Sequence, residues 1–236
     1  MDYLEEYIRI GEPGKRDRAQ AWQMAIGLQA VDGLQTSEYL RDTAVRHIEG
    51  EITVGEAQQL IHAYYQTKVN RTPQDDGMEE ADKVAGNIID VLSTPSFGFS
   101  TEGYISVHRR IFNRVFKFAG RIRDYDISKK EWVLRGDSVN YLNHEDIRRA
   151  LDYDIAQERD FSYSGLPQDE VIDHIARFIS GLWQIHAFAE GNTRTTAVFA
   201  VLYLRSIGFE ADNDLFAKHS WYCRNALVSA NYRYVQ

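Results

Sequence analysis

A short stretch near residue 190 combines several side chains that could handle a phosphate group. The run from His186 to Arg194 reads His-Ala-Phe-Ala-Glu-Gly-Asn-Thr-Arg. The histidine can take a proton near neutral pH. The carboxylate of Glu190 is the kind of ligand that Mg²⁺ prefers, and the guanidinium of Arg194 matches phosphate oxygens. A base, a metal ligand and an anion site this close together predict the transfer of a phosphate-bearing group.

Two helices are expected to hold this stretch in place. Residues 197–204 are apolar on every side, which predicts a buried helix that begins near 190–193. The first turn of a helix presents unpaired N–H groups to an anion, Gly191 lets the backbone come close, and Asn192 adds side-chain donors. The helix before His186 is predicted from apolar residues that step by three and four: Val171, Ile175, Phe178, Leu182 and Ile185.

Each of these features has an ordinary explanation when it is taken alone. A histidine at the end of an apolar helix usually packs in a core, and Glu-Gly-Asn is usually only a turn. The chemistry therefore depends on the joint occurrence of these residue types at fixed spacing, which is rare at average composition.

The composition argues against several other classes of protein. The chain has 236 residues, a net charge of −8 and a single cysteine, Cys223. The negative charge argues against a nucleic-acid partner, and a lone cysteine excludes an internal disulfide framework. The first residues are acidic where a secretory signal is basic, and the longest apolar run, 197–204, is too short to span a bilayer. We therefore expect a cytoplasmic protein without a membrane or nucleic-acid partner.

One stretch departs from this acidic balance. Between Glu102 and Asp124 the sequence has no acidic residue. The basic residues there are Arg109, Arg110, Arg114, Lys117, Arg121 and Arg123. Two explanations stay open at this point: a solvated basic face of a helix, or local positive potential beside a phosphate site.

The first 68 residues predict a small helical block. Short helices are expected at 19–30, at 37–48, and after Thr53, which forms a capping-box pattern with Glu56. Such a block buries only a modest core alone. The polar stretch that follows, 69–80, contains Pro73 and Gly77, and these breakers predict a linker.

The remainder of the chain is predicted to be helical with one exception. In residues 123–141, apolar residues flank Lys129 and Lys130, and Gly136-Asp137 is a turn signal, which predicts a short β-hairpin. The apolar residues are Ile127, Trp132, Val133 and Leu134. Helices are expected at 81–92, from Ser100 or Thr101 to Gly120, and from Asn143 to about Gln157. The fold class is therefore all-α, with a single short hairpin.

The stretch from His186 to Arg194 resembles the signature of the Fic (filamentation induced by cAMP) family, HxFx(D/E)GNxRxxR. The resemblance extends over about 99–236 and implies a helical catalytic domain. Fic proteins typically transfer AMP from Mg²⁺-bound ATP to a hydroxyl side chain of a target protein. By resemblance, His186 is the general base that deprotonates a Ser, Thr or Tyr of the target, and Glu190 binds Mg²⁺.

The same resemblance implies roles for the neighbouring residues. Phe188 anchors the loop in the core, Gly191 and Asn192 hold the α-phosphate, and Arg194 holds the β-phosphate. The hairpin corresponds to the family's flap, which binds an extended target segment by main-chain pairing. The flap residues are Lys129, Lys130, Glu131, Trp132, Val133 and Leu134.

Three positions depart from the family signature. Ala187 replaces the usual proline, and Thr193 replaces a glycine while keeping the backbone N–H near the phosphates. Ala197 replaces the second arginine, which in the family commonly meets the γ-phosphate or an inhibitory glutamate. The identity of the donor nucleotide is therefore left open.

The N-terminal block resembles the three-helix antitoxin module of the VbhA type. Such modules carry a glutamate that blocks the γ-phosphate position. Here Asp32 stands in its place, and Leu28 replaces the usual Ser or Thr. The implied organisation is a regulatory block at 1–68, a linker and connecting helix at 69–98, and a catalytic domain at 99–236. The block either restrains the catalytic domain or only stabilises it.

Three functions remain open from the sequence. The first is protein adenylyl transfer from Mg²⁺-bound ATP. The second is another nucleotidyl or phosphoryl transfer, or removal of AMP from a modified protein. The third is a nucleotide-binding module without turnover. The target protein, the oligomeric state, including a homo-oligomer, and a longer natural C-terminus are also left open.

Overall fold

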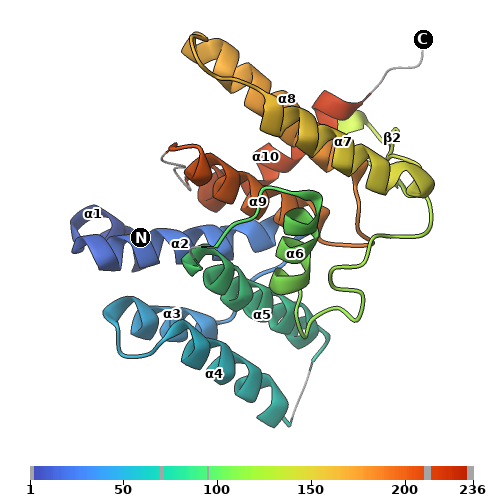
Figure 1. Ribbon diagram of the computed structural model, residues 1–236. Coiled ribbons are helices and arrows are strands. Elements are labelled where there is room, and N and C mark those ends of the chain that lie inside the picture. Colours follow the sequence, from blue (N-terminus) through green and yellow to red (C-terminus); the bar gives the residue numbers. More distant parts are fainter. Residues whose placement is uncertain (1–2, 70–71, 95, 210–213, 233–236) are drawn as a thin grey trace. The chain divides into compact units, whose positions relative to one another are not determined.

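Helices make up most of both units into which the chain divides (Figure 1). The computed structural model describes residues 3–69, 72–94, 96–209 and 214–232. The first unit comprises Met1–Pro95, Arg110–Ala119 and Glu210–Trp221, and the second comprises Ser96–Arg109, Gly120–Phe209 and Tyr222–Gln236. The predicted class, all-α with one short hairpin, is confirmed.

The first unit is built around its second helix, α2 (Pro13–Gly27). Its elements are α1 (Tyr3–Ile10), α2, the 3₁₀ turn η1 (Leu28–Asp32), α3 (Glu38–Glu49), α4 (Val54–Thr67) and α5 (Pro73–Ser93). Helix α2 packs against α1, α3 and α5, while α4 packs against α3 and α5. Trp22 of α2 is fully buried and donates from Nε1 to Nδ1 of His47 at 3.0 Å. This bond gives the indole N–H the partner that burial requires.

The two predicted helix starts in this unit are confirmed. Ser37 is the N-cap of α3 and accepts a hydrogen bond from the N–H of Leu40 at 3.1 Å. Thr53 and Glu56 form the reciprocal capping box at the start of α4. Each contact satisfies an N–H group that the first turn of a helix leaves without a partner.

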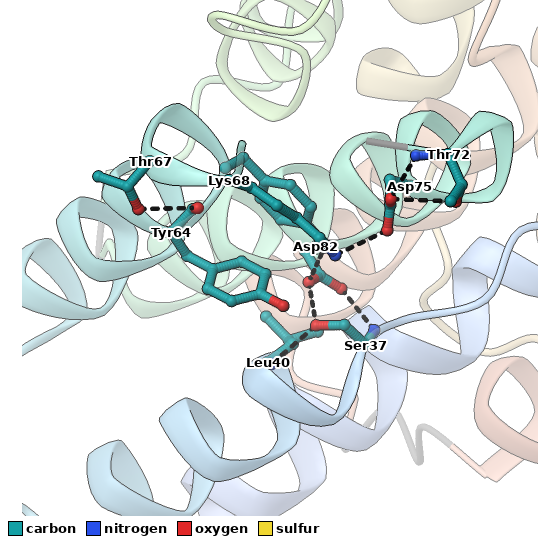
Figure 2. Close-up of polar contacts among 9 residues, drawn as sticks. Ser37, Leu40, Tyr64, Thr67, Lys68, Thr72, Asp75 and Asp82 are labelled. Atoms are coloured by element: carbon teal, nitrogen blue, oxygen red, sulfur yellow. Dashed lines mark hydrogen bonds and ion pairs between the residues drawn. The ribbon is translucent and has the colours of Figure 1, made fainter. Parts of the chain in front are cut away.

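Ser37 is also tied to a buried carboxylate on α5. Asp82 is fully buried and accepts hydrogen bonds from the N–H of Ser37 at 2.9 Å, from its hydroxyl, and from the hydroxyl of Tyr65 at 2.7 Å. Figure 2 shows the carboxylate of Asp82 facing Ser37, with Leu40 on the other side of the serine. Burial raises the pKa of Asp82 above its ordinary value of 3.8. The three donors offset the cost of burying this carboxylate.

Removal of the Ser37 hydroxyl should therefore cost more than removal of an exposed cap. We expect Ser37→Ala to lower the free energy of unfolding by about 2–3 kcal/mol, the sum of a lost cap and a lost bond to a buried carboxylate. The matched control is Thr53→Ala, which removes an exposed cap and should cost about 1 kcal/mol. Urea unfolding followed by circular dichroism compares the two. Equal losses would show that the bond to Asp82 adds nothing.

Two predicted boundaries in this unit are wrong for the same reason. The stretch 69–80 was expected to be a linker, but α5 begins at Pro73, and α2 begins at Pro13 rather than at Ala19. Proline is well suited to the first turn of a helix, where its missing N–H costs nothing. Asp75 accepts from the N–H and the hydroxyl of Thr72 and pairs with Lys68 at 2.7 Å, so the start of α5 is fixed by its own polar residues (Figure 2).

The helix expected to end at Gly120 ends earlier. Helix α6 spans Thr101–Ile111, and residues 112–115 and 117–120 form turns. The side-chain amide of Asn87 donates to the carbonyl oxygens of Ile111 at 3.1 Å and Asn113 at 3.0 Å. Arg114 then takes a left-handed conformation, with φ at 59°. Because a distant side chain binds these carbonyls, the helix ends without a local stop signal.

The second unit contains the predicted motif. Its elements are α6 up to Arg109, β1 (Ser128–Lys130), η2 (Trp132–Leu134), β2 (Ser138–Asn140), η3 (His144–Asp146), α7 (Ile147–Asp160), α8 (Gln168–Ile185), α9 (Asn192–Ser206) and the last part of α10 (Asp214–Asn231). Helix α8 packs against α7 and α9. The helix predicted from Asn143 begins instead with η3, and α7 continues to Asp160. Helix α9 is buried along nearly its whole length, as expected from its apolar sequence.

The predicted hairpin is present and short. Strands β1 and β2 pair antiparallel, with Lys129 opposite Val139. The turn between them contains η2 and is closed by the N–H of Glu131, which donates to the carbonyl of Asp137 at 2.9 Å. Val139 lies in an apolar cluster with Tyr141, Trp183 of α8 and Val228 of α10. One face of the hairpin is therefore held by the core of the second unit.

Candidate active site

The motif forms the loop between α8 and α9. His186 ends α8 in a left-handed conformation, with φ at 49°, and its N–H donates to the carbonyl of Trp183 at 3.1 Å. Gly191 precedes α9 with φ at 77°. A left-handed conformation is uncommon for residues other than glycine, although histidine is among those that tolerate it. The loop therefore turns sharply at both of its ends.

The imidazole of His186 is buried and has no hydrogen-bond partner among the described residues. The residue is 4% exposed, and both ring nitrogens are without a partner there. The ring stacks on Tyr141, with centroids 3.7 Å apart, and meets the edge of Trp183 at 5.6 Å. Burial holds the pKa of His186 well below its ordinary value of 6.5, and the positive charge of Lys129 acts in the same direction. The imidazole is therefore neutral at neutral pH, as a proton acceptor must be.

A buried arginine fixes the backbone around His186. Arg123 is 4% exposed and donates from Nε to the carbonyl of His186 at 2.7 Å and from Nη2 to that of Ile185 at 3.3 Å. It also donates to the carbonyls of Tyr125 and Leu142, which flank the hairpin. Arg123 belongs to the predicted basic stretch, but here it binds carbonyl oxygens instead of facing solvent. Arg109, Arg114, Lys117 and Arg121 are exposed.

Phe188 lies in an aromatic cluster beneath the loop. The residue is fully buried and stacks on His108 at 3.8 Å and on Tyr104 at 5.6 Å. The hydroxyl of Tyr104 bonds to that of Thr196 in α9 at 2.8 Å. These contacts join α6, the loop and α9.

His108 was not identified from the sequence, yet it holds the loop directly. Its Nδ1 accepts a hydrogen bond from the N–H of Gly120 at 2.8 Å. Nε2 therefore carries the proton and donates to the carbonyl of Glu190 at 3.1 Å. Burial lowers the pKa of His108 to about 4. Because Glu190 is 82 residues away along the chain, no local pattern could have identified this contact.

The low pKa of His108 predicts a pH dependence of stability. Between about pH 6.5 and pH 4 the unfolded chain binds a proton at His108 and the folded chain does not, so stability falls as the pH falls. One such group contributes about 1.4 kcal/mol per pH unit. The amide of His108→Gln can replace both hydrogen bonds but does not titrate. Between pH 6.5 and 4.5 we therefore expect the free energy of unfolding of this variant to fall by about 2 kcal/mol less than that of the wild type. Urea unfolding at several pH values measures this, and parallel curves would contradict it.

Most polar side chains at the start of α9 are used inside the loop. The Asn192 side chain accepts from the N–H of Phe188 at 2.9 Å and donates to its carbonyl at 2.7 Å. Thr193 accepts from Nε1 of Trp183 at 3.0 Å, and Arg194 is 1% exposed. Asn192 was expected to hold a phosphate, but its amide shapes the loop here. The backbone N–H groups of the first turn and Gly191 are the groups suited to an anion.

Glu190 lies at the surface of the loop. Its side chain is 56% exposed, and its Oε2 is 3.8 Å from Nζ of Lys129 in β1. No group of three His, Cys, Asp or Glu residues that could hold a metal occurs in the described part of the chain. Mg²⁺ is commonly bound by one or two carboxylates, water and substrate phosphates. A single exposed carboxylate beside a helix N-terminus fits a magnesium ion that arrives with a nucleotide.

The six predicted flap residues do not face one way. Lys129 points toward Glu190, and Lys130 is exposed. Trp132 is 66% exposed, in the turn η2. Glu131 is 3% exposed and forms a bidentate pair with Arg224 of α10, with both distances at 2.9 Å. Glu131 was expected to bind a target, but it anchors the turn.

The last two flap residues also face inward. Val133 and Leu134 are partly buried and pack against the apolar cluster that contains Trp183 and Val228. The exposed part of the flap is therefore formed by the two lysines and Trp132. Asp32, the predicted regulatory residue, ends η1 in the first unit and is exposed, and its role stays a prediction.

A cavity elsewhere in the second unit is not the candidate site. It has a volume of about 380 Å³ and lies between α7 and α8. It is lined by Tyr153, Asp154, Gln157, Glu158, Phe161, His174, Arg177, Phe178 and Gly181. No residue of the stretch 186–194 is among them. The buried Glu158 accepts from Tyr163, Tyr203 and His174, so its carboxylate is already satisfied.

One stretch of the chain matches a known protein family. Residues 98–204 match the model of the Fic/DOC family, so the chain carries a Fic/DOC domain over this stretch. The fold is similar to the crystal structure of a Fic family protein from Desulfovibrio desulfuricans G20, with a TM-score of 0.54 and 12% sequence identity. The match covers 96% of this chain but only 60% of that protein. No curated protein matches the chain by sequence.

The family match leaves the first unit's resemblance untested. It begins at residue 98, so the antitoxin-like character of the N-terminal block and the predicted domain boundaries remain predictions. Among the described residues, no helix has both the length and the apolar character needed to cross a membrane.

Proposed function

We propose that the chain is a protein adenylyltransferase that moves AMP from ATP to a hydroxyl side chain of a target protein. The observation that carries this proposal is the neutral, buried imidazole of His186, whose ring nitrogens have no partner among the described residues. A base of this kind, held on the same short loop as the N-terminus of α9, suits a reaction between a hydroxyl and a phosphate.

At phosphorus, the reaction forms one bond and breaks one, and a proton moves from the hydroxyl to His186. The hydroxyl oxygen of the target attacks the α-phosphorus of the nucleotide, and a ring nitrogen of His186 takes the hydroxyl proton. The bond from the α-phosphorus to the oxygen that bridges to the β-phosphate breaks, and pyrophosphate leaves. The N–H groups at the start of α9 stabilise the charge on the phosphates, and Gly191 leaves room for them.

Glu190 is the residue that would hold Mg²⁺. When bound, the ion would neutralise part of the phosphate charge. Lys129 lies beside this carboxylate and adds a positive charge from the flap. The strand that carries Lys129 would receive an extended target segment by main-chain pairing, which fixes where the target hydroxyl lies but selects little sequence.

A second candidate is phosphoryl transfer, and one observation favours it. Ala197 stands where the family signature has its second arginine, and it is 5% exposed within α9. A buried methyl group cannot bind a terminal phosphate. A nucleotide without that contact is free to lie in another orientation, with a different phosphorus atom facing the hydroxyl.

Intact-mass spectrometry separates these candidates. The purified chain is incubated with Mg²⁺ and ATP, GTP, CTP or UTP in turn, with a chelator control. A gain of one adenylyl group supports the first candidate, and a gain of one phosphoryl group supports the second. If no nucleotide gives a product, although binding is seen by calorimetry, the chain is a nucleotide-binding module and both transferase proposals fail.

Regulation by the N-terminal block can be tested in the full chain. The first unit includes α5 and residues 110–119, so a truncation near residue 69 would cut through it. We propose that Asp32 restrains the transfer, and Asp32→Ala should then raise the rate of automodification. A rate equal to that of the wild type would reject Asp32 as the inhibitory residue.

A further inference from the structure

Tyr141 joins the hairpin to the candidate base. It directly follows β2, and its N–H donates to the carbonyl of Ile127 at 3.2 Å, which extends the pairing of the hairpin. Its ring is 6% exposed and lies nearly parallel to the imidazole of His186, at 3.7 Å between centroids and 17° between planes. The same ring meets the edge of Trp183 at 5.4 Å. A movement of the hairpin at this point must therefore move a ring in contact with His186.

The polar atoms of this stacked pair lack the partners that burial normally requires. The hydroxyl of Tyr141 and both ring nitrogens of His186 are buried without a hydrogen bond to any described residue. Catalytic histidines are usually oriented by a bond from one ring N–H to a carbonyl or carboxylate. Neither ring nitrogen of His186 makes such a bond among the described residues, although the carbonyl of Trp183 favours the protonated ring. Stacking on Tyr141 is therefore the contact that holds the plane of this imidazole.

The rings of Tyr141 and Trp183 cover His186, and that of Tyr141 is held by fewer hydrogen bonds to the described residues. A general base must come within hydrogen-bond reach of the proton that it takes, yet His186 is only 4% exposed. Trp183 is held in place by the bond from its Nε1 to Thr193 at 3.0 Å. The side chain of Tyr141 has no such bond to the described residues. Its hydroxyl therefore loses no protein partner when the ring moves.

We infer that Tyr141 is the positioning residue of His186: its ring fixes the imidazole plane and excludes water while the flap is empty, and it moves with the hairpin to admit a target hydroxyl. The covering of His186 stands independently of the reaction. The admission of a hydroxyl rests on the proposed function. Loss of the ring should expose the imidazole to water and to small reagents.

The charges around His186 set the direction of the expected titration change. Burial disfavours the protonated imidazole most strongly, and the charges of Lys129 from β1, Arg123 from the loop before the hairpin and Arg224 from α10 act in the same direction. The backbone carbonyl of Trp183 opposes them. Substitution of Tyr141 leaves these charges in place and weakens only the burial. The pKa of His186 should therefore rise toward its ordinary value of 6.5 without reaching it.

Chemical modification of His186 tests the covering directly. The full chain is treated with diethyl pyrocarbonate, and the rate at His186 is mapped by mass spectrometry relative to the partly exposed His144 in the same sample. In Tyr141→Leu, which removes the stack, we expect modification about 3- to 10-fold faster, as the loss of one aromatic contact would allow. Tyr141→Phe, which keeps the ring, should behave as the wild type. Trp132→Leu, on the exposed turn of the same hairpin, is the matched control.

Each outcome decides the inference. Equal rates for Tyr141→Leu and the wild type would overturn it, and so would a Tyr141→Phe variant as reactive as Tyr141→Leu. If Tyr141→Leu does not fold, an increase in Tyr141→Phe still overturns the inference, and an unchanged rate supports it. NMR titration of the imidazole should show the higher pKa in Tyr141→Leu only.

The role of Tyr141 in positioning His186 for the transfer reaction is tested by kinetics. In Tyr141→Leu, kcat should fall while KM for the nucleotide stays unchanged, because the base is misplaced and the phosphate site is not touched. An unchanged kcat would reject the positioning role. If the wild type transfers nothing from any nucleotide, the proposed function fails, whereas the modification and titration results still decide whether Tyr141 covers His186.

Discussion

The His186→Asn variant should transfer the nucleotidyl group about 10²- to 10⁴-fold more slowly than the wild type, the range that a positioned general base contributes. The neutral imidazole can take a proton at neutral pH, and a carboxamide cannot. Asparagine is the appropriate replacement because residue 186 has a φ of 49°, and asparagine tolerates this left-handed conformation better than alanine does. The loss should therefore be one of chemistry and not of folding.

Single-turnover kinetics with saturating nucleotide measure this effect. The dissociation constant for the nucleotide should stay the same, because the phosphate site is formed by the start of α9 and not by the imidazole. His144→Asn changes another histidine of the same unit, outside the motif, and should leave the rate unchanged. If His186→Asn kept more than about a tenth of the wild-type rate, His186 would not be the base.

The helices and the motif loop could be predicted because their signals are local. Ser37 and Thr53 each accept a hydrogen bond from an N–H within their own first turn, so a few neighbouring residues determine where α3 and α4 begin. The apolar stripe of α8 and the uniformly apolar α9 likewise depend on residues close in sequence. Patterns of this kind are readable from one sequence.

The residues that support the loop could not be predicted because their partners are distant. His108 bonds to the carbonyl of Glu190, and Arg123 to that of His186. The position of Glu131 in the flap predicts target binding, yet its partner Arg224 is 93 residues further along the chain. A sequence pattern shows that these residues are charged or titratable, but not that tertiary packing buries them.

The wrong boundaries have a related origin. The stretch 69–80 is polar and contains Pro73 and Gly77, which is also the composition of a linker. What makes it helical is a cap formed by Thr72 and Asp75 and a proline at the first helical position. Conversely, α6 ends earlier than predicted, at Ile111, because Asn87 of another helix binds the carbonyl of Ile111. Breaker residues alone therefore mark neither boundary.

Substitution of Arg123 should give the largest loss of stability in the second unit. Its guanidinium binds the carbonyl oxygens of Tyr125, Leu142, Ile185 and His186, and its side chain is fully buried. Arg123→Met would leave these four carbonyls without their donor. The bonds to His186 and Ile185 are buried and those to Tyr125 and Leu142 are partly buried. At about 1–3 kcal/mol for each buried group left unpaired, we expect a loss of at least about 3 kcal/mol, or failure to fold.

Arg123→Lys keeps this prediction testable if the methionine variant does not fold. A lysine ammonium carries its N–H donors on a single nitrogen, whereas the guanidinium spreads its donors over a planar fork. The ammonium therefore cannot reach all four carbonyls, and a loss of about 2 kcal/mol in the free energy of unfolding should remain. Arg121→Lys is the matched control, because Arg121 is exposed and its replacement should change stability by less than about 0.5 kcal/mol.

Urea unfolding gives the free energies of unfolding of these variants, and hydrogen exchange locates the change. Faster exchange should be confined to the hairpin and the loop around His186. Equal stability of the two lysine variants would mean that Arg123 fills space without holding the loop.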